Sequence, residues 1–463
     1  MVAFPWRRSG SADALARAVA GLVARGGQID AAAIASAGAT VRAAERGDQP
    51  TVPTPTIPTV GVTGTNGKTT TTRLIAAMAR HAGNRVGWTS TDGVYVDGVL
   101  VEDGDWSGYG GAGQVLSRDD VDVAVLEIAR GGILLRGIGT TRLDVAVVTN
   151  VSADHLGLLG IDTLDELAEV KATIVRIVEP AGWAVLNGDD PRVLAMRHAT
   201  RARPFVFAID PRSPAIRESL GAGGAATTVI DGHVTVLQAN GDADALVPLV
   251  DVPVTIGGVS TPNVSNVLAA TAAATGLGLP RKSVIGGLTG FVPDPQTNPG
   301  RMNIYGRADR TVIVDMAHNE ASLRALLEVT DGIAGGGARW VVLGMAGDRT
   351  DELLRSVGEM AALGAEHVVI GEKERYFRGR ERDAMTELMR SGALAGGATH
   401  MPAFPTELDA MAASVTASAP GDVVAVMCHA EREALADWLR DNGFRLLTPA
   451  EVRDRVSAGR GRR

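Results

Sequence analysis

The segment Gly64-Thr-Asn-Gly-Lys-Thr-Thr70 constrains the fold of this chain more than any other stretch. It follows a short apolar run, Ile57 to Val62, and precedes an apolar-periodic helix that contains Leu74 and Met78. A glycine-rich turn in this context lets successive backbone N–H groups face a bound polyphosphate at the positive end of the helix. The strict spacing of such a motif has glycine where this chain has Val62, so a simple glycine turn is the alternative. We predict a nucleotide-binding loop.

The side chains of this loop suit a nucleoside triphosphate. Lys68 can reach the terminal phosphates, and the Thr69 hydroxyl can ligate Mg²⁺. The ATP-binding residues that the loop predicts are Gly64, Thr65, Asn66, Gly67, Lys68, Thr69 and Thr70.

The composition describes a globular protein of two or three domains, with 463 residues, 45% hydrophobic and 21% charged. A net charge of −8 argues against a large nucleic-acid-binding surface. Cys428 is the only cysteine, which excludes an internal disulfide and a Cys-rich zinc site. The uncharged stretch 252–280 is broken by Pro262 and Asn263, which favours a loop and a buried helix over a membrane span. No secretory signal is evident, so we expect a cytoplasmic protein with neither nucleic-acid nor membrane partners.

Strand and helix patterns alternate along most of the chain, which predicts an α/β fold. Residues 1–57 are expected to form a short helical segment and a Pro-rich linker. Residues 58–296 are expected to form an ATP-binding central domain on a parallel sheet, with a small antiparallel piece around Asp231-Gly232. Residues 297–463 are expected to form a Rossmann-like α/β domain.

Polar side chains follow the predicted strands of the first domain, at the edge where open α/β sheets bind ligands. Glu127 ends an apolar strand and can ligate Mg²⁺ opposite Thr69, although a polar strand end is a common structural feature. His155 follows another strand, and Lys171 lies on the next predicted helix. Taken alone, these two indicate an ordinary loop histidine and a solvated lysine.

In their order along the chain, these features resemble the Mur ligase family. Within that family the chain is most similar to the C-terminal half of the cyanophycin synthetases, without their ATP-grasp half. The similarity is densest in Thr89–Gly93, Leu126–Ile133 and Ala153–Leu158. The motifs that carry the family resemblance are Gly64–Thr70, Asp154-His155, Lys171, Leu186–Asp190, Pro299–Arg301 and Asp315–Asn319.

The resemblance implies an ATP-dependent amide ligase. Such an enzyme phosphorylates a substrate carboxylate and joins it to the amine of an amino acid, releasing ADP and phosphate. The implied catalytic residues are Lys68, Glu127, His155, Lys171 and Arg301. The implied Mg²⁺ ligands are Thr69, Glu127, His155 and Lys171, with the lysine as a carbamate that supplies oxygen ligands.

The resemblance also implies contacts for the nucleotide and the substrates. Beyond the loop, the nucleotide is expected to contact Asn266, Arg301, Asp315, His318 and Asn319. The candidate residues for the carboxylate substrate are Thr91, Asp92 and Gly93, together with the glycine-rich segment 104–113. The candidates for the carboxylate of the incoming amino acid are Arg349, Arg378 and Arg380, because guanidinium groups bind carboxylates with two hydrogen bonds.

Two other functions stay open. One is a nucleotide-binding partner subunit without its own ligase activity, which the lack of an ATP-grasp half and the divergent glycine-rich segment 104–113 favour. The presence of both His155 and Lys171 disfavours it, because an ATP binder needs only one metal site. The other is a folylpolyglutamate-like ligase, which Ala129-Arg-Gly-Gly132 disfavours. A separate ATP-grasp partner and a homo-oligomer are both compatible with the sequence.

Overall fold

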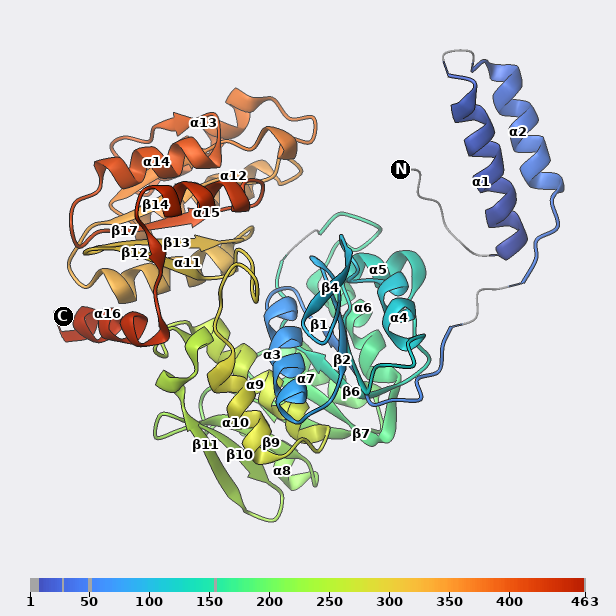
Figure 1. Ribbon diagram of the computed structural model, residues 1–463, viewed down its shortest axis with the longest axis horizontal. Coiled ribbons are helices and arrows are strands. Elements are labelled where there is room, and N and C mark those ends of the chain that lie inside the picture. The colour runs from blue at the N-terminus through green and yellow to red at the C-terminus, as the bar shows by residue number, and fades with distance from the viewer. Residues whose placement is uncertain (1–7, 27–28, 49–51, 154–155, 462–463) are drawn as a thin grey trace.

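The computed structural model describes residues 8–26, 29–48, 52–153 and 156–461 (Figure 1). It contains two β-sheets, each with both parallel and antiparallel strand pairs. Each sheet has buried apolar clusters on both of its faces. This arrangement confirms the predicted fold class, a parallel-sheet α/β unit followed by a second, Rossmann-like α/β unit.

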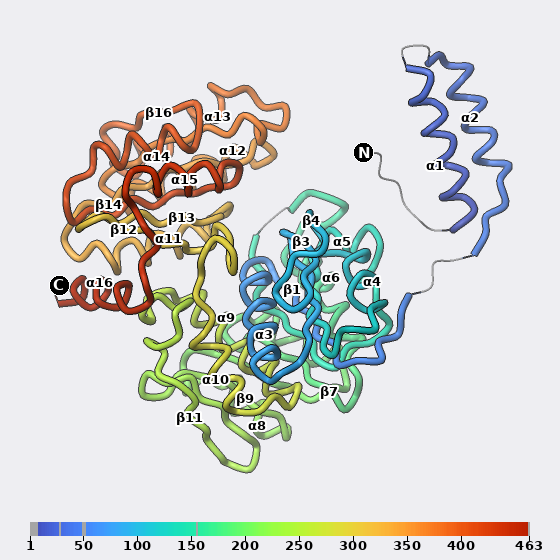
Figure 2. Tube along the Cα trace, viewed as in Figure 1, coloured from blue at the N-terminus to red at the C-terminus, as the bar shows by residue number. Residues whose placement is uncertain are grey.

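The first two helices form a hairpin that stands apart from both sheets (Figures 1 and 2). They are α1 (Ser9–Ala24) and α2 (Ala31–Ala43). Asp30 caps α2 by accepting a hydrogen bond from the backbone N–H of Ala33 at 2.7 Å. None of the residues described for this hairpin lines the cavities discussed below.

The central sheet has eleven strands in the described residues, in the order β11-β10-β9-β8-β7-β6-β1-β5-β2-β3-β4. Pairing is parallel from β9 to β2 and antiparallel at both edges. The turn at Asp231-Gly232 joins β9 to β10, as predicted. The β3–β4 hairpin at the other edge was not predicted, although Asp97-Gly98 carries the same turn signal. The strands are β1 (Thr59–Thr63), β2 (Val86–Ser90), β3 (Gly93–Val96), β4 (Val99–Asp103), β5 (Val123–Glu127), β6 (Leu143–Val148), β7 (Val178–Asn187), β8 (Arg203–Phe207), β9 (Ala225–Ile230), β10 (His233–Gln238) and β11 (Ala243–Pro248).

Helices cover both faces of this sheet (Figure 1). The uncharged stretch 252–280 forms a loop and a buried helix, α9, as predicted. Among the described helices, none combines the length and the apolar character that a membrane crossing requires. The helices are α3 (Lys68–His81), α4 (Tyr109–Leu116), α5 (Arg130–Arg136), α6 (Leu164–Arg176), α7 (Pro191–Ala195), α8 (Pro214–Gly221), α9 (Thr261–Gly276) and α10 (Arg281–Gly290).

The second sheet has seven strands in the described residues, in the order β16-β15-β14-β17-β13-β12-β18. Its parallel strands run from β16 to β13, and β12 and β18 add an antiparallel edge. The strands are β12 (Asn303–Arg307), β13 (Arg310–Asp315), β14 (Arg339–Leu343), β15 (His367–Gly371), β16 (Ala403–Phe404), β17 (Val423–Met427) and β18 (Arg445–Leu446). The helices are α11 (Glu320–Ala334), α12 (Asp351–Gly364), α13 (Arg382–Ala395), α14 (Glu407–Ala417), α15 (Arg432–Asp441) and α16 (Pro449–Gly461).

Candidate active site

The predicted nucleotide-binding loop connects β1 to α3. Gly67, immediately before the helix, has a φ of +85°, in the left-handed region that glycine adopts without strain. A Cβ atom on Gly67 would lie 2.1 Å from Oδ1 of Asn266, and one on Gly64 would lie 1.8 Å from Oγ1 of Thr149. Both glycines are therefore required by space, and the loop passes close to α9 and to the end of β6.

Polar side chains at the ends of β6 and β7 hold this loop. Asn150 Oδ1 accepts from Asn66 N at 2.9 Å, and Asn150 Nδ2 donates to Asn66 O at 3.0 Å. Asn187 Nδ2 donates to Thr149 O at 2.7 Å, which fixes the end of β6 in turn. Sequence reasoning gave these asparagines no role, although Asn187 lies in a motif that carried the family resemblance, Leu186–Asp190. Their contacts show that they preorganise the loop.

A cavity of about 900 Å³ opens beside the loop, and we call it the main cavity. It brings residues of the central unit together with residues of the second α/β unit. Its charged lining contains five cationic side chains and two carboxylates, so it favours an anionic ligand. The lining residues are Gly64–Thr69, Thr91, Asp105–Gly111, Glu127, Ala129–Gly132, Leu135, Arg136, Leu167, Lys171, Arg301, Met316 and His318.

Glu127 lies at the end of β5 with 1% of its surface exposed. Among the described residues, neither of its buried carboxylate oxygens accepts a hydrogen bond. Burial raises the pKa of Glu127, while Lys68 and Arg301 act in the opposite direction. A buried carboxylate that the Thr69 hydroxyl approaches, with both groups on the same cavity, fits a site for a hard cation such as Mg²⁺.

Of the two other predicted metal ligands, Lys171 and His155, the structure describes only Lys171. Lys171 lies on α6, is 2% exposed, and lines the main cavity. His155 lies outside the described residues. Among the residues that the structure does describe, no three His, Cys, Asp or Glu side chains gather into a metal-binding cluster.

The second α/β unit also contributes to the lining of the main cavity. Arg301 lies just before β12 and influences the pKa values of both Glu127 and Asp315. Burial raises the pKa of Asp315 to about 6, against the opposing effect of Arg301. Asp315 Oδ2 accepts from Met302 N at 3.0 Å, so this carboxylate fixes the backbone next to Arg301.

Two further nucleotide candidates lie at the start of α11. Asn319 caps this helix and donates from Nδ2 to Asn66 Oδ1 at 3.1 Å, a direct contact between the second unit and the loop. His318 lines the main cavity, and its Nδ1 hydrogen-bonds with Met316 O at 3.0 Å. Since a carbonyl only accepts, Nδ1 is the donor in this contact.

The three predicted substrate residues make different contacts. Thr91 lines the main cavity, whereas the Asp92 carboxylate pairs with two arginines. Gly93 begins β3 with a φ of +152°, and a Cβ atom there would lie 2.3 Å from Leu100. These three assignments to the carboxylate substrate stay predictions.

The three arginines predicted for the amino acid do not line the main cavity. Arg378 pairs with Asp348, and Arg380 donates to Gly347 O at 3.0 Å and to Arg349 O at 2.9 Å. These two hydrogen bonds from Arg380 fix the backbone of the loop that follows β14.

Arg130 and Arg136 on α5 line the main cavity and were not predicted. The motif Ala129-Arg-Gly-Gly132 pointed to this position, but sequence alone does not show which side of the sheet the arginine faces.

A buried polar cluster supports the loop after β17. Lys373 and Glu407 form an ion pair at 2.9 Å, and each side chain is only 1% exposed. Glu407 also accepts hydrogen bonds from the backbone N–H groups of His429 at 2.8 Å, Ala430 at 3.1 Å and Glu431 at 3.0 Å. This cluster had no role in the sequence predictions, and it fixes the segment that leads into α15.

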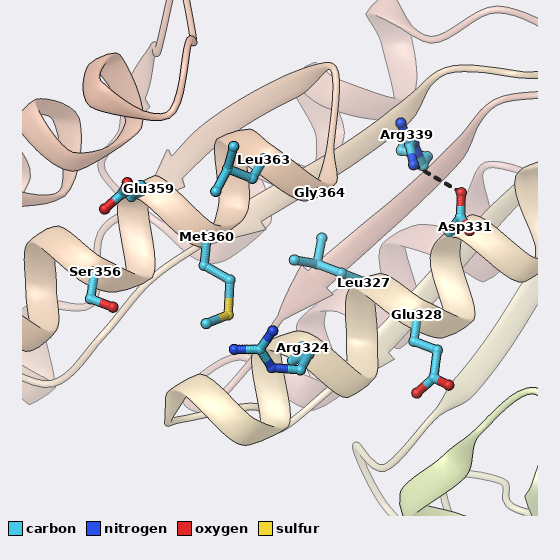
Figure 3. Close-up of a pocket in the computed structure, with 10 residues that line it drawn as sticks. All are labelled: Arg324, Leu327, Glu328, Asp331, Arg339, Ser356, Glu359, Met360, Leu363 and Gly364. Atoms are coloured by element: carbon cyan, nitrogen blue, oxygen red, sulfur yellow. Dashed lines mark hydrogen bonds and ion pairs between the residues drawn. The ribbon is translucent and has the colours of Figure 1, made fainter.

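A separate cavity of about 520 Å³ lies between α11 and α12, where Figure 3 shows its lining. None of its lining residues belongs to the nucleotide-binding loop or to the main cavity. Arg339 pairs there with Asp331 at 2.8 Å. We assign this cavity no part in the chemistry.

Comparison with known proteins identifies the family. The model for the Mur ligase middle domain matches residues 62–274, and the model for the Mur ligase glutamate ligase domain matches residues 300–429. The chain is 30% identical to the UDP-N-acetylmuramyl-tripeptide synthetase of Deinococcus radiodurans, over 78% of this chain and 70% of that protein. The chain belongs to the Mur ligase family.

Within the Mur ligase family, the chain is also similar to cyanophycin synthetases. It is 40% identical to that of Synechocystis over 71% of this chain, but over only 37% of that protein. The chain therefore matches little more than a third of the length of these relatives.

Solved structures of Mur ligase type share the fold. Escherichia coli FolC in complex with DHPP and ADP superimposes with a TM-score of 0.61 at 20% identity, over 84% of this chain and 90% of that chain. A pseudomurein peptide ligase from Methanothermus fervidus gives 0.57 at 18% identity, over 84% of this chain and 79% of that chain.

The Mur ligase family consists of ATP-dependent amide ligases that use Mg²⁺. The main cavity agrees with that chemistry, because its lining combines the predicted nucleotide-binding loop, a buried carboxylate and several cationic side chains.

Proposed function

We propose that this chain is an ADP-forming ligase that couples a carboxylate substrate to the amine of an amino acid. The observation that carries the proposal is the lining of the main cavity. The predicted nucleotide-binding loop and Glu127 line this cavity together with three arginines, Arg130, Arg136 and Arg301. A polyphosphate and a second anion can thus lie together in one space of about 900 Å³.

The first step transfers the γ-phosphoryl group of ATP. The loop N–H groups and Lys68 hold the phosphates, while Arg130 and Arg136 attract the substrate carboxylate toward the same cavity. A carboxylate oxygen attacks the γ-phosphorus, the bond to the bridging oxygen breaks, and ADP leaves. Arg301 stabilises the charge that spreads over the transferring group.

The second step forms the amide. The amine nitrogen attacks the acyl carbon, inorganic phosphate leaves, and the nitrogen loses its proton. Arg349, Arg378 and Arg380 stay candidates for the carboxylate of the incoming amino acid. A separate ATP-grasp protein is a candidate supplier of the first substrate, because the chain matches only part of the cyanophycin synthetases. We place the reaction in the cytoplasm, where ATP is available.

Mg²⁺ bound by Thr69, Glu127, His155 and Lys171 would neutralise phosphate charge. Lys171 suits this role only as a carbamate, because a buried ammonium repels a cation whereas a carbamate supplies oxygen ligands. The amine adds to the carbon of CO₂ and loses a proton. Intact-mass measurement under native conditions should show a shift of about +44 Da in the wild type and none in Lys171→Arg.

The decisive experiment follows oxygen from the carboxylate to phosphate. Carboxylate substrates labelled with ¹⁸O are incubated with ATP, Mg²⁺ and a panel of amino acids, with Lys68→Ala as the control. The proposal predicts ADP, an amide and inorganic phosphate that carries one labelled oxygen. Release of AMP and pyrophosphate would overturn the acyl-phosphate route. ATP binding without turnover across the panel would instead support a partner subunit.

A further inference from the structure

Asp92 occupies the junction of the two α/β units. It follows β2 in the central unit, and its side chain is only 12% exposed. Its Oδ2 accepts from Arg73 Nη2 on α3 at 3.1 Å, and its Oδ1 accepts from Arg432 Nη1 on α15 at 3.2 Å. One carboxylate thus joins a cation of the central unit to a cation of the second unit.

Both arginines also contact the segment that carries Arg301. Arg73 donates from Nη1 to Thr297 O at 2.7 Å. A Cβ atom on Gly300 would lie 2.7 Å from Cδ of Arg432, so the Arg432 side chain packs directly on the residue before Arg301. The bridge therefore fixes this segment from both sides.

The charged partners of Asp92 are the two arginines, Arg73 and Arg432, rather than a substrate. A carboxylate repels a second carboxylate, so Asp92 is poorly suited to bind an acidic substrate directly. Between two guanidinium groups, one of them 4% exposed, its charge is already matched. The buried pair of Lys373 and Glu407 fixes the loop that precedes Arg432, so the second half of the bridge is preorganised.

We propose that the Arg73–Asp92–Arg432 bridge is a positioning device, which holds the two α/β units so that Arg301 reaches the main cavity. Arg73 and Asp92 set the position from the central unit, and Arg432 completes it from the second unit. None of its three residues lines the main cavity, so the bridge acts through Arg301. The inference rests on the proposed function, because the role of Arg301 does.

The test centres on Arg432, because Asp92→Asn would leave the buried Arg73 charge uncompensated and could prevent folding. Arg432→Met should lower kcat roughly 10- to 100-fold, the scale expected when a catalytic group is misplaced by about 1 Å. Equilibrium affinity for ATP should stay within about twofold, because the central unit holds the phosphates. Arg432→Lys should recover part of the rate.

Arg440→Met is the matched control. Arg440 lies on the same helix, is 70% exposed, and pairs only with residues of its own helix, Asp437 and Asp441, in the contacts described. This variant should keep the wild-type rate. An equal loss of rate in both variants would overturn the proposal.

A distance measurement separates this inference from the proposed function. Spin labels are placed on cysteines introduced at two exposed apolar positions, Val99 on β4 and Leu363 on α12. Cys428 is buried and its thiol pKa is raised by burial, so it should stay unlabelled. With AMP-PNP and Mg²⁺, we expect one narrow distance distribution in the parent and a broad one in Arg432→Met.

This readout does not need turnover. A parent that binds AMP-PNP without catalysis would refute the ligase function and leave the distance test intact. An unchanged distribution in Arg432→Met would refute the bridge, whether or not kcat falls.

Discussion

Replacing Lys373 by methionine removes one partner of a fully buried ion pair and keeps an unbranched side chain one atom shorter than lysine. Lys373 Nζ contacts Glu407 at 2.9 Å and donates to Met427 O at 2.8 Å. Each partner is 1% exposed, so water cannot replace the lost ammonium. An uncompensated buried charge costs about 3–5 kcal/mol of folding free energy. We expect Lys373→Met to destabilise the second α/β unit by that amount.

The double variant Lys373→Met/Glu407→Gln should recover much of the loss. Replacing a whole buried pair by neutral groups is often close to neutral. Glu407 now accepts hydrogen bonds from three backbone N–H groups. The single amide oxygen of glutamine can accept only some of these bonds. We therefore expect the double variant to be about 1–2 kcal/mol less stable than the wild type, from the N–H groups left unpaired.

The pair also predicts a pH dependence on the acid side. Burial alone would raise the pKa of Glu407, but the Lys373 ammonium and the backbone N–H donors hold it below its ordinary value. A carboxyl group with a depressed folded-state pKa contributes stability above its unfolded pKa, near 4.5. That contribution is lost as pH falls through the lower, folded-state pKa, and it should be absent from the double variant.

Native-state hydrogen exchange of β14, β15 and β17 measures this free energy without assuming that the two units unfold together. The amides of β1, β5 and β6 serve as the internal control, because they lie in the other sheet. A loss below about 1 kcal/mol in Lys373→Met would refute the reasoning, since a broken buried pair cannot be that mild. A double variant no more stable than the single variant would refute it as well.

Three further predictions concern the main cavity. Arg301→Ala should lower turnover about 10²- to 10³-fold, measured in single-turnover experiments. It should change the equilibrium affinity for ATP far less than Lys68→Ala does. Normal turnover in Arg301→Ala would exclude the assigned role. Gly67→Ala places a Cβ atom 2.1 Å from Asn266 Oδ1, on a residue whose φ is +85°. We therefore expect at least a tenfold weaker affinity for ATP, measured by calorimetry. Unchanged binding would mean that the loop can shift. Because burial raises the pKa of Asp315 to about 6, its contribution to stability should fall as pH rises from about 4 through 6, and Asp315→Asn should flatten that part of a urea-denaturation profile; identical profiles would contradict the shift.

The periodic pattern of the chain predicts its fold class well, because buried strands and amphipathic helices leave local signals. The loop at Gly64–Thr70, the hairpin at Asp231-Gly232 and the buried helix in 252–280 all follow from residues that are neighbours in sequence. The hairpin of β3 and β4 escaped prediction even though Asp97-Gly98 marks its turn. Its strand β4 is exposed along its whole length, so it lacks the alternation that identifies a half-buried strand.

The sequence by itself determined which residue types this protein offers for the proposed phosphate and metal chemistry, because Lys68, Thr69 and Glu127 belong to local motifs next to predicted strands. Only the tertiary structure decided which distant residues share one space. Arg130 joins the main cavity, and Asp92 pairs with Arg432, 340 positions away. The type of a residue fixes which chemical groups it offers. Its partners depend on how the two units pack against each other, and no local sequence pattern encodes that packing.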